Sequence, residues 1–328
     1  GAAGDTWTWD RPALTNGTAY LLRTNTTDYA GNNWVRDQTP NVTFDNAAPT
    51  AGIQVPVGGG FYNSLATISG TSTDNVGVST IALSIQDITI PAPNCYATAT
   101  DDFTAACPPN AAGWFPAKGT VGGWTFGGIT WTGAHQYIVT ARATDQATNA
   151  QTIFGLNTSS NAFTYVTGAQ APTVRILNPN ADRHNDLSII SGTAAIDLPN
   201  ELALVHVRVK EAEVLQQYWD PVAQVFNSVN AAVAWTTATY VADWTSWTLS
   251  SAIPWVGGSK YEVMARAKDK AGNFSVTFTT TVIYDYTAPL TAVGYPGNAT
   301  VVNSLSSTSG TIVDQTFNGL NIGTVTAV

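Results

Sequence analysis

The chain has 328 residues, of which 44% are hydrophobic and 11% charged, and its formal net charge is −9. This acidity excludes the basic surface that binding to nucleic acid or to an anionic membrane requires, whereas carboxylates suit hard cations such as calcium. The apolar content is enough for folded cores, and no apolar run approaches the ~20 residues of a membrane-spanning helix.

The first predicted strand begins at Tyr20 and ends in a turn that contains Asp28 and Asn32. The same strand and turn return twice, with Tyr137, Asp145 and Asn149 and then with Tyr261, Asp269 and Asn273. Asp and Asn side chains bond to nearby backbone groups in turns, which makes them suitable strand ends. The recurrence indicates an internal repeat of about 120 residues.

Two further markers have the same period. An Ala-Pro pair occurs at Ala48-Pro49, Ala171-Pro172 and Ala288-Pro289, and a Ser-Gly-Thr triplet has its glycine at Gly70, Gly192 and Gly310. Proline does not continue a strand ladder, so each Ala-Pro pair predicts a repeat boundary. The predicted pieces are the C-terminal half of a repeat (1–47), two whole repeats (48–170 and 171–287) and the N-terminal half of another (288–328).

Hydrophobicity alternates with period two inside the predicted strands, which is typical of half-buried antiparallel strands. The third Tyr strand predicts inward-facing Tyr261, Val263, Ala265 and Ala267, and outward-facing Glu262, Met264, Arg266 and Lys268. In another strand, His206 lies on the outward face, and we expect it to be solvated. Short strands with turn signals between them predict an all-β protein built of tandem antiparallel β-sandwich repeats.

The two cysteines, Cys95 and Cys107, are predicted to close a loop that the next repeat lacks. A disulfide is the first interpretation and implies an oxidising compartment, with two free thiols as the alternative. A zinc site would need further ligands at short spacing, and neither a CxxC motif nor a nearby histidine supplies them.

The Tyr strand with its Asp-x-Ala-Gly-Asn turn, the Ile-Ser-Gly-Thr strand and the Asp-x-x-Ala-Pro junction together resemble bacterial immunoglobulin-like repeats. The resemblance covers essentially the whole chain. It implies the repeat domains of large surface adhesins or of extracellular stalk and fibre proteins, at the cell surface and without catalysis. In this topology, the exit strand of one domain ends beside two loops of the next.

That topology predicts a calcium site at the first junction, formed by Asp45, Asp74 and Asp145, because three converging carboxylates repel one another unless a cation joins them. Asp285 and Asp314 repeat the pattern at the last junction, where Asp28 of a neighbouring copy would complete the set. The middle junction should bind calcium weakly or not at all, because Gly168 and Gln170 replace its Asp. The alternative is that each Asp only caps its own turn.

No HExxH, GxSxG, P-loop or GxGxxG pattern occurs, so we expect no enzyme. Eleven tryptophans support a second hypothesis, in which Ig-like accessory modules of a secreted hydrolase bind a polysaccharide ligand. The rings of such a platform would be Trp124, Trp131, Trp244 and Trp247. Their recurrence before each Tyr strand favours a structural role instead.

The two half-repeats do not duplicate each other, since the head supplies the last strands of a sandwich and the tail supplies the first. A half-sandwich alone exposes an apolar face and unpaired strand edges. We therefore expect neighbouring copies of the protein as partners, joined head to tail in a fibre, stalk or filament, or as continuous repeats of one polymer.

Overall fold

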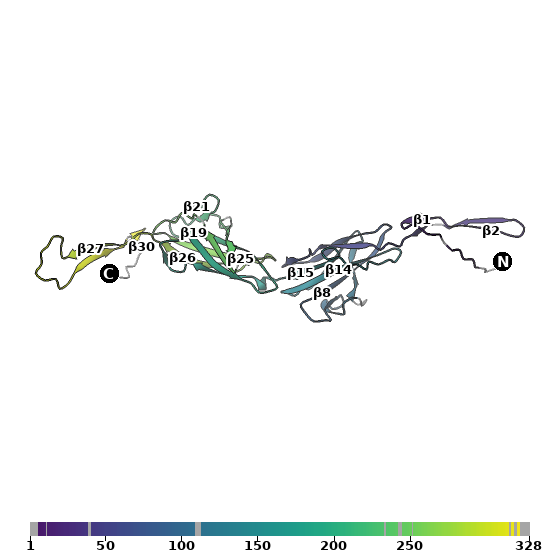
Figure 1. The fold of residues 1–328 in the computed structure, drawn as a ribbon, viewed down its shortest axis with the longest axis horizontal. Coiled ribbons are helices and arrows are strands. Elements are labelled where there is room, and N and C mark those ends of the chain that lie inside the picture. The colour runs from purple at the N-terminus through teal and green to yellow at the C-terminus, as the bar shows by residue number, and fades with distance from the viewer. Residues whose placement is uncertain are drawn as a thin grey trace. The chain divides into compact units, whose positions relative to one another are not determined.

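The computed structural model describes residues 6–10, 12–38, 41–108, 113–232, 234–241, 245–250, 252–314, 316–317 and 320–321. Trp244 lies outside these residues. The chain divides into two compact units, residues 1–165 and 166–328, each described by itself below. Figure 1 shows that strands dominate both units. No helix among the described residues is long and apolar enough to cross a membrane.

The first unit contains a sandwich of two antiparallel sheets. One sheet has the order β12 (Lys118–Thr120), β13 (Gly123–Gly127), β7 (Thr67–Thr73) and β5 (Thr50–Val55). The other has the order β10 (Asp102–Ala105), β9 (Cys95–Ala97), β8 (Val78–Asp87), β14 (His135–Asp145), β15 (Ser160–Tyr165) and β6 (Gly60–Tyr62), and β11 (Phe115–Pro116) pairs with β8. The β6–β15 pair is parallel and the others are antiparallel.

The second unit repeats this arrangement strand for strand. Its smaller sheet has the order β16 (Thr173–Asn178), β18 (Ile189–Ala195), β24 (Ser246–Ser250) and β23 (Thr239–Val241). Its larger sheet has the order β17 (Arg183–His184), β26 (Phe278–Tyr284), β25 (Lys260–Asp269), β19 (Leu202–Glu211), β20 (Tyr218–Asp220) and β21 (Val225–Ser228), and β22 (Thr236–Thr237) pairs with β19. A short 3-10 helix, η2 (Gly168–Gln170), precedes β16.

Each unit also carries strands outside its sandwich. In the first unit, β1 (Thr18–Tyr20) pairs with β4 (Val42–Phe44), and β2 (Arg23–Thr27) pairs with β3 (Asn33–Asp37). In the second, β27 (Leu290–Tyr295) pairs with β28 (Ser309–Val313), and β29 (Thr316–Phe317) pairs with β30 (Leu320–Asn321). The strand order of the two sandwiches is that of immunoglobulin-like domains, which confirms the predicted fold class.

The period-two alternation places the core as predicted. Tyr137 and Val139 on β14, like Tyr261 and Val263 on β25, are fully buried. One expected orientation is wrong, because Met264 is 6% exposed instead of facing water. The chain around Ala231 covers that outer face of β25, where Arg208 donates to the Ala231 carbonyl oxygen and to the Met264 sulfur.

Candidate metal centre

The turn after each Tyr strand fixes the position of its Asp carboxylate. In the first sandwich, the Tyr137 hydroxyl accepts a hydrogen bond from the Thr132 N–H at 2.9 Å, which anchors the start of β14. At the other end of β14, the Asp145 carboxylate accepts bonds from the Asn149 backbone N–H at 2.8 Å and from the Asn149 side-chain amide at 2.7 Å. Asp145 is 2% exposed, so these two bonds hold a buried carboxylate in one orientation.

Three carboxylates from distant parts of the sequence converge at this turn. Asp45 precedes β5, Asp74 follows β7 and Asp145 ends β14, and one oxygen from each lies within 4.8 Å of the others. They form the one group of three potential metal ligands found within the described residues. The Asn149 side-chain amide also donates to the Asp45 carbonyl oxygen at 3.3 Å, which joins Asp45 to the same loop.

The hydrogen bonds leave part of this cluster uncompensated. Asp74 Oδ2 accepts the Val76 and Gly77 N–H groups, and the bond from Gly77 is the largest cause of the lowered pKa of the Asp74 carboxyl. Asp45 Oδ1 accepts the Ala47 N–H at 3.1 Å, but Asp45 Oδ2 is buried without a hydrogen-bond partner among the described residues. A buried carboxylate oxygen with no donor is costly, and a cation would compensate for it.

The donor set and spacing suit calcium. Calcium binds carboxylate and carbonyl oxygens at 2.3–2.6 Å, so about 4.8 Å is close to the largest separation that two ligands of one ion can have. The oxygens of Asp45, Asp74 and Asp145 fall within that limit. The cluster contains no thiol or imidazole, the ligand types that zinc prefers.

The middle junction contains an amide at the corresponding place. The buried Asn200 side-chain amide donates to Asp269 Oδ2 at 2.7 Å and to the Gln170 carbonyl oxygen at 3.5 Å. Sequence reasoning missed Asn200, although it lies just before the first residue of β19, as a turn amide would. An amide N–H compensates for the Asp269 charge without any ion.

The three remaining predicted ligands, Asp28, Asp285 and Asp314, are not members of this cluster. Asp28 accepts the N–H groups of Ala30 and Asn32 in its own turn, and the side-chain bond from Asn32 is the largest cause of its lowered pKa. Asp285 Oδ1 accepts the Thr287 N–H at 3.0 Å, and Asp314 is half-buried. The association of these three across neighbouring copies stays a prediction.

The second sandwich has an insertion after β19, with β20 and β21, where the first has β9 and β10 after β8, so the prediction that the next repeat lacks this loop is wrong. The two insertions are held by different chemistry. Cys95 and Cys107 form a disulfide with an S–S distance of 2.03 Å. In the second sandwich, Glu211 is 3% exposed, and its carboxylate accepts backbone N–H groups of the following loop, including those of Val214 and Leu215. Burial raises the pKa of Glu211, but these N–H groups outweigh it, and the pKa is lowered overall.

Of the four tryptophans of the second hypothesis, the three that the structure describes, Trp124, Trp131 and Trp247, do not form a surface platform. Trp124 and Trp247 are each 1% exposed, so the rings that would stack on a sugar are inside the two cores. Trp131 is half-buried, and its Nε1 donates to the Leu65 carbonyl oxygen at 2.9 Å. The physical reason is that these rings lie on inward-facing positions, where Gly70 and Gly192 leave room for Trp124 and Trp247.

The outer face of the large sheet in the second sandwich also differs from expectation. Trp235 covers the guanidinium groups of Arg208 and Arg266, each 4.3 Å from its ring centroid. His206 lies beside the same ring, with 6.3 Å between the ring centroids, and is half-buried instead of freely solvated. Burial, followed by the charge of Arg266, lowers the pKa of His206. In the first sandwich, Arg142 lies 4.3 Å over Trp114 in the same manner. A period-two pattern does not predict that an outward-facing Arg packs against a Trp that is distant in the sequence.

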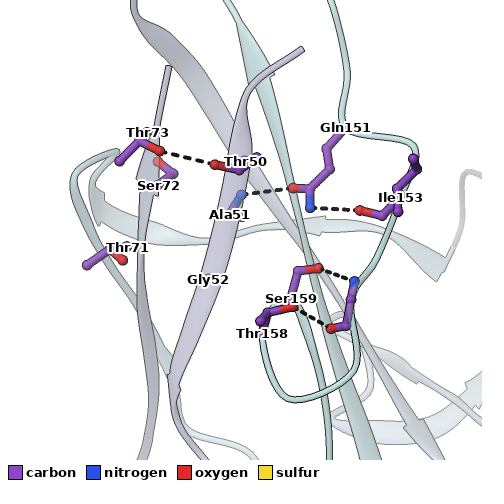
Figure 2. A pocket seen from close by; sticks show the side chains of 11 residues that line it. Thr50, Ala51, Gly52, Thr71, Ser72, Thr73, Gln151, Ile153, Thr158 and Ser159 are labelled. Carbon is purple, nitrogen blue, oxygen red and sulfur yellow. Dashed lines mark hydrogen bonds between the residues drawn. The ribbon is translucent and has the colours of Figure 1, made fainter. Parts of the chain in front are cut away.

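A hollow beside β5 contains several polar groups, and these bond to one another and to the backbone around them (Figure 2). Gln151 Oε1 accepts the Ala51 N–H at 2.9 Å, and Gln151 Nε2 donates to the Ile153 carbonyl oxygen at 3.0 Å. Ser159 Oγ accepts the Gly155 N–H at 2.9 Å. These hydrogen bonds therefore attach β5 to the loop before β15, and we assign no ligand to the hollow.

No family model and no curated protein matches the chain. Among solved structures, it is similar to fibronectin(III)-like modules of Clostridium thermocellum CbhA (13% identity, TM-score 0.35, 72% of this chain and 94% of that one). It is also similar to the FN1–FN3 domains of chicken CNTN1 (14%, 0.39, 83% and 77%) and to a Ca²⁺-stabilised adhesin with which an Antarctic bacterium binds ice (16%, 0.27, 82% and 56%). The strand order of each sandwich, and not these likenesses, establishes the fold.

Proposed function

We propose that this chain is a non-catalytic structural or adhesive segment of an extracellular, repetitive surface protein, and that calcium stiffens its first junction. The observation that carries the proposal is the carboxylate cluster, in which junction residue Asp45 meets loop residues Asp74 and Asp145. An ion held there would tie the segment before the sandwich to the sandwich itself. Stiffness of a repeat array depends on such contacts between neighbouring repeats.

Three further observations support an extracellular, non-catalytic role. The Cys95–Cys107 disulfide suits an oxidising compartment. His135, whose Nδ1 lies 2.6 Å from Asp87 Oδ2, stacks on the core residue Tyr137, which is the setting of a structural histidine. The polar side chains of the hollow beside β5 bond to the strands and turns around them.

The calcium proposal is tested by thermal unfolding with and without the ion. Addition of 1 mM CaCl₂ to the metal-free chain should raise the melting temperature of the first sandwich, because an ion that binds only the folded state stabilises it by mass action. Asp74→Asn should remove this rise, since the amide keeps an acceptor for the Gly77 N–H but lacks the charge. Asp186→Asn is the matched control, because Asp186 only caps the Ser188 N–H in the other sandwich.

An unchanged melting temperature in calcium, together with no heat in a calorimetric titration, would refute the calcium site. A calcium response that survives in Asp74→Asn would place the ion elsewhere. The accessory-module hypothesis is judged separately, by titrating tryptophan fluorescence with cellulose and xylan oligosaccharides. Saturable binding there would replace the structural proposal with a carbohydrate-binding one.

A further inference from the structure

Strand β28 reproduces a strand that lies in the middle of a sheet in both complete sandwiches. Gly310 on β28 pairs with Val293, as Gly70 on β7 pairs with Ile53 and Gly192 on β18 pairs with Ile176. All three pairings also show the same register shift directly after that residue pair. Residues 290–313 therefore have the backbone arrangement of the first two strands of a sandwich.

In both complete sandwiches, the glycine of this strand faces a tryptophan from the next strand of the sheet. Trp124 lies opposite Gly70 and Trp247 lies opposite Gly192. A Cβ added at Gly70 would come within 2.2 Å of the Trp124 ring, and one at Gly192 within 2.3 Å of the Trp247 ring. At Gly310, the three nearest atoms belong to the backbone of Ala292 and Val293.

The surface around Gly310 is apolar and exposed where its counterparts are buried. Val293 is 74% exposed, whereas Ile53 is 9% and Ile176 is 7% exposed. Soluble proteins rarely leave such a strand face and its free edge uncovered, because both favour association.

Residues 7–9 contain a tryptophan at the repeat position that faces this glycine in the first complete sandwich. Trp7 precedes turn residue Asp28 by 21 positions, the same spacing as from Trp124 to Asp145. Trp9 corresponds to Phe126 in the same way. Trp7 is 69% and Trp9 66% exposed, while Trp124 is 1% and Phe126 8% exposed.

We propose that residues 7–9 of one chain add as a strand to β28 of a second copy, with the Trp7 ring packed over Gly310 of that copy. The register follows from the β13–β7 pair, in which Trp124 faces Gly70 and Thr125 faces Ser69. Thr8 of one copy then faces Ser309 of the next. The partner is therefore a second copy of this chain, and this assignment rests on the proposed structural role. The head-to-tail contact generates an open assembly unless rotation closes a ring.

The test is a cysteine pair in the full 328-residue chain. The double variant Thr8→Cys and Ser309→Cys should form an intermolecular disulfide under mild oxidation, because directly opposed residues have Cβ atoms about 4.5–5.5 Å apart. Both positions correspond to sites outside the core, Thr125 and Ser69, so the new thiols should not disturb packing. The control Thr8→Cys with Val313→Cys, displaced by four residues along β28, should not cross-link above background.

Association is measured in parallel by analytical ultracentrifugation. Trp7→Ala should weaken self-association by about 30-fold or more, as expected for a buried tryptophan at the centre of an interface. Tyr29→Ala is the matched control, since this fully exposed aromatic residue lies in the turn after β2.

Absence of a cross-link beyond the control, or cross-linking only within one chain, would overturn the proposal. Retention of monomeric protein on cellulose or chitin that depends on Trp7, without a cross-link, would assign this surface to a saccharide and also overturn it. The calcium response of the first sandwich uses none of these residues. Failure of the docking test with that response intact therefore rejects this inference alone.

Discussion

Single side chains that sequence patterns do not single out hold the loops of these sandwiches. Glu211 binds the loop after β19 through several backbone N–H groups, and the Asn200 side-chain amide donates a hydrogen bond to Asp269 at the middle junction. Both side chains are buried, where a charge without partners would be costly. The structural role of each residue therefore depends on its neighbours in space and not on its neighbours in the sequence.

Glu211→Gln should destabilise the second sandwich at neutral pH by about 1–3 kcal/mol, since the amide has one acceptor oxygen for N–H groups that two carboxylate oxygens now accept. The pKa of Glu211 is lowered in the fold. Its contribution is therefore complete above the unfolded pKa near 4.5 and is lost as the pH falls through the lower folded value. Urea unfolding at pH 7 and at pH 3 measures this, and an equal difference between wild type and variant at both pH values would contradict it.

At the scale of elements, the long insertions after β8 and β19 are each held in place, but by different interactions. The segment after β8 is closed by the Cys95–Cys107 disulfide, whereas the segment after β19 is tied by the Glu211 carboxylate and covered through Arg208 and Trp235. Aromatic packing lies beside the disulfide, where the ring centroids of Tyr96 and Phe103 are 5.6 Å apart. The disulfide therefore adds to a loop that already has a small core.

Replacement of both cysteines, Cys95→Ala with Cys107→Ala, should lower the stability of the first sandwich by about 3 kcal/mol, the chain-entropy value for a short closed loop. The second sandwich should be unaffected by the same change and by reducing agent. Differential scanning calorimetry with and without dithiothreitol measures both effects. A loss below about 1 kcal/mol would show that the aromatic contacts alone order the loop.

At the scale of the whole molecule, each unit buries a core of its own. One core centres on Trp124 and Tyr137, the other on Trp247 and Tyr261. In each core, a tryptophan packs against a glycine of the neighbouring strand in the same sheet. The approach is so close that no side chain fits at the glycine position. The stability of a repeat therefore depends on a pair of residues more than 50 positions apart.

Gly192→Ala should lower the melting temperature of the second sandwich by several degrees, because the new Cβ would lie 2.0 Å from the Arg175 carbonyl oxygen and 2.3 Å from the Trp247 ring. Overpacking of this kind costs about 1–3 kcal/mol. Calorimetry reports the change, and Gly168→Ala is the control, since a Cβ there meets nothing within 4 Å. Equal melting temperatures for the two variants would refute the packing argument.

The sequence by itself determined the fold class, the repeat and the inward faces of its strands. These features follow from local and periodic chemistry, namely the Tyr and Asp-Asn markers, the Ala-Pro pairs and the period of two. The tertiary structure decided which outward-facing side chains are covered by other segments and which charged groups lie close together. Met264 and His206 occupy outward positions, yet a segment remote in sequence covers them. The convergence of Asp45, Asp74 and Asp145 likewise depends on the sandwich, because only packing of its two sheets brings three separate chain segments to one point.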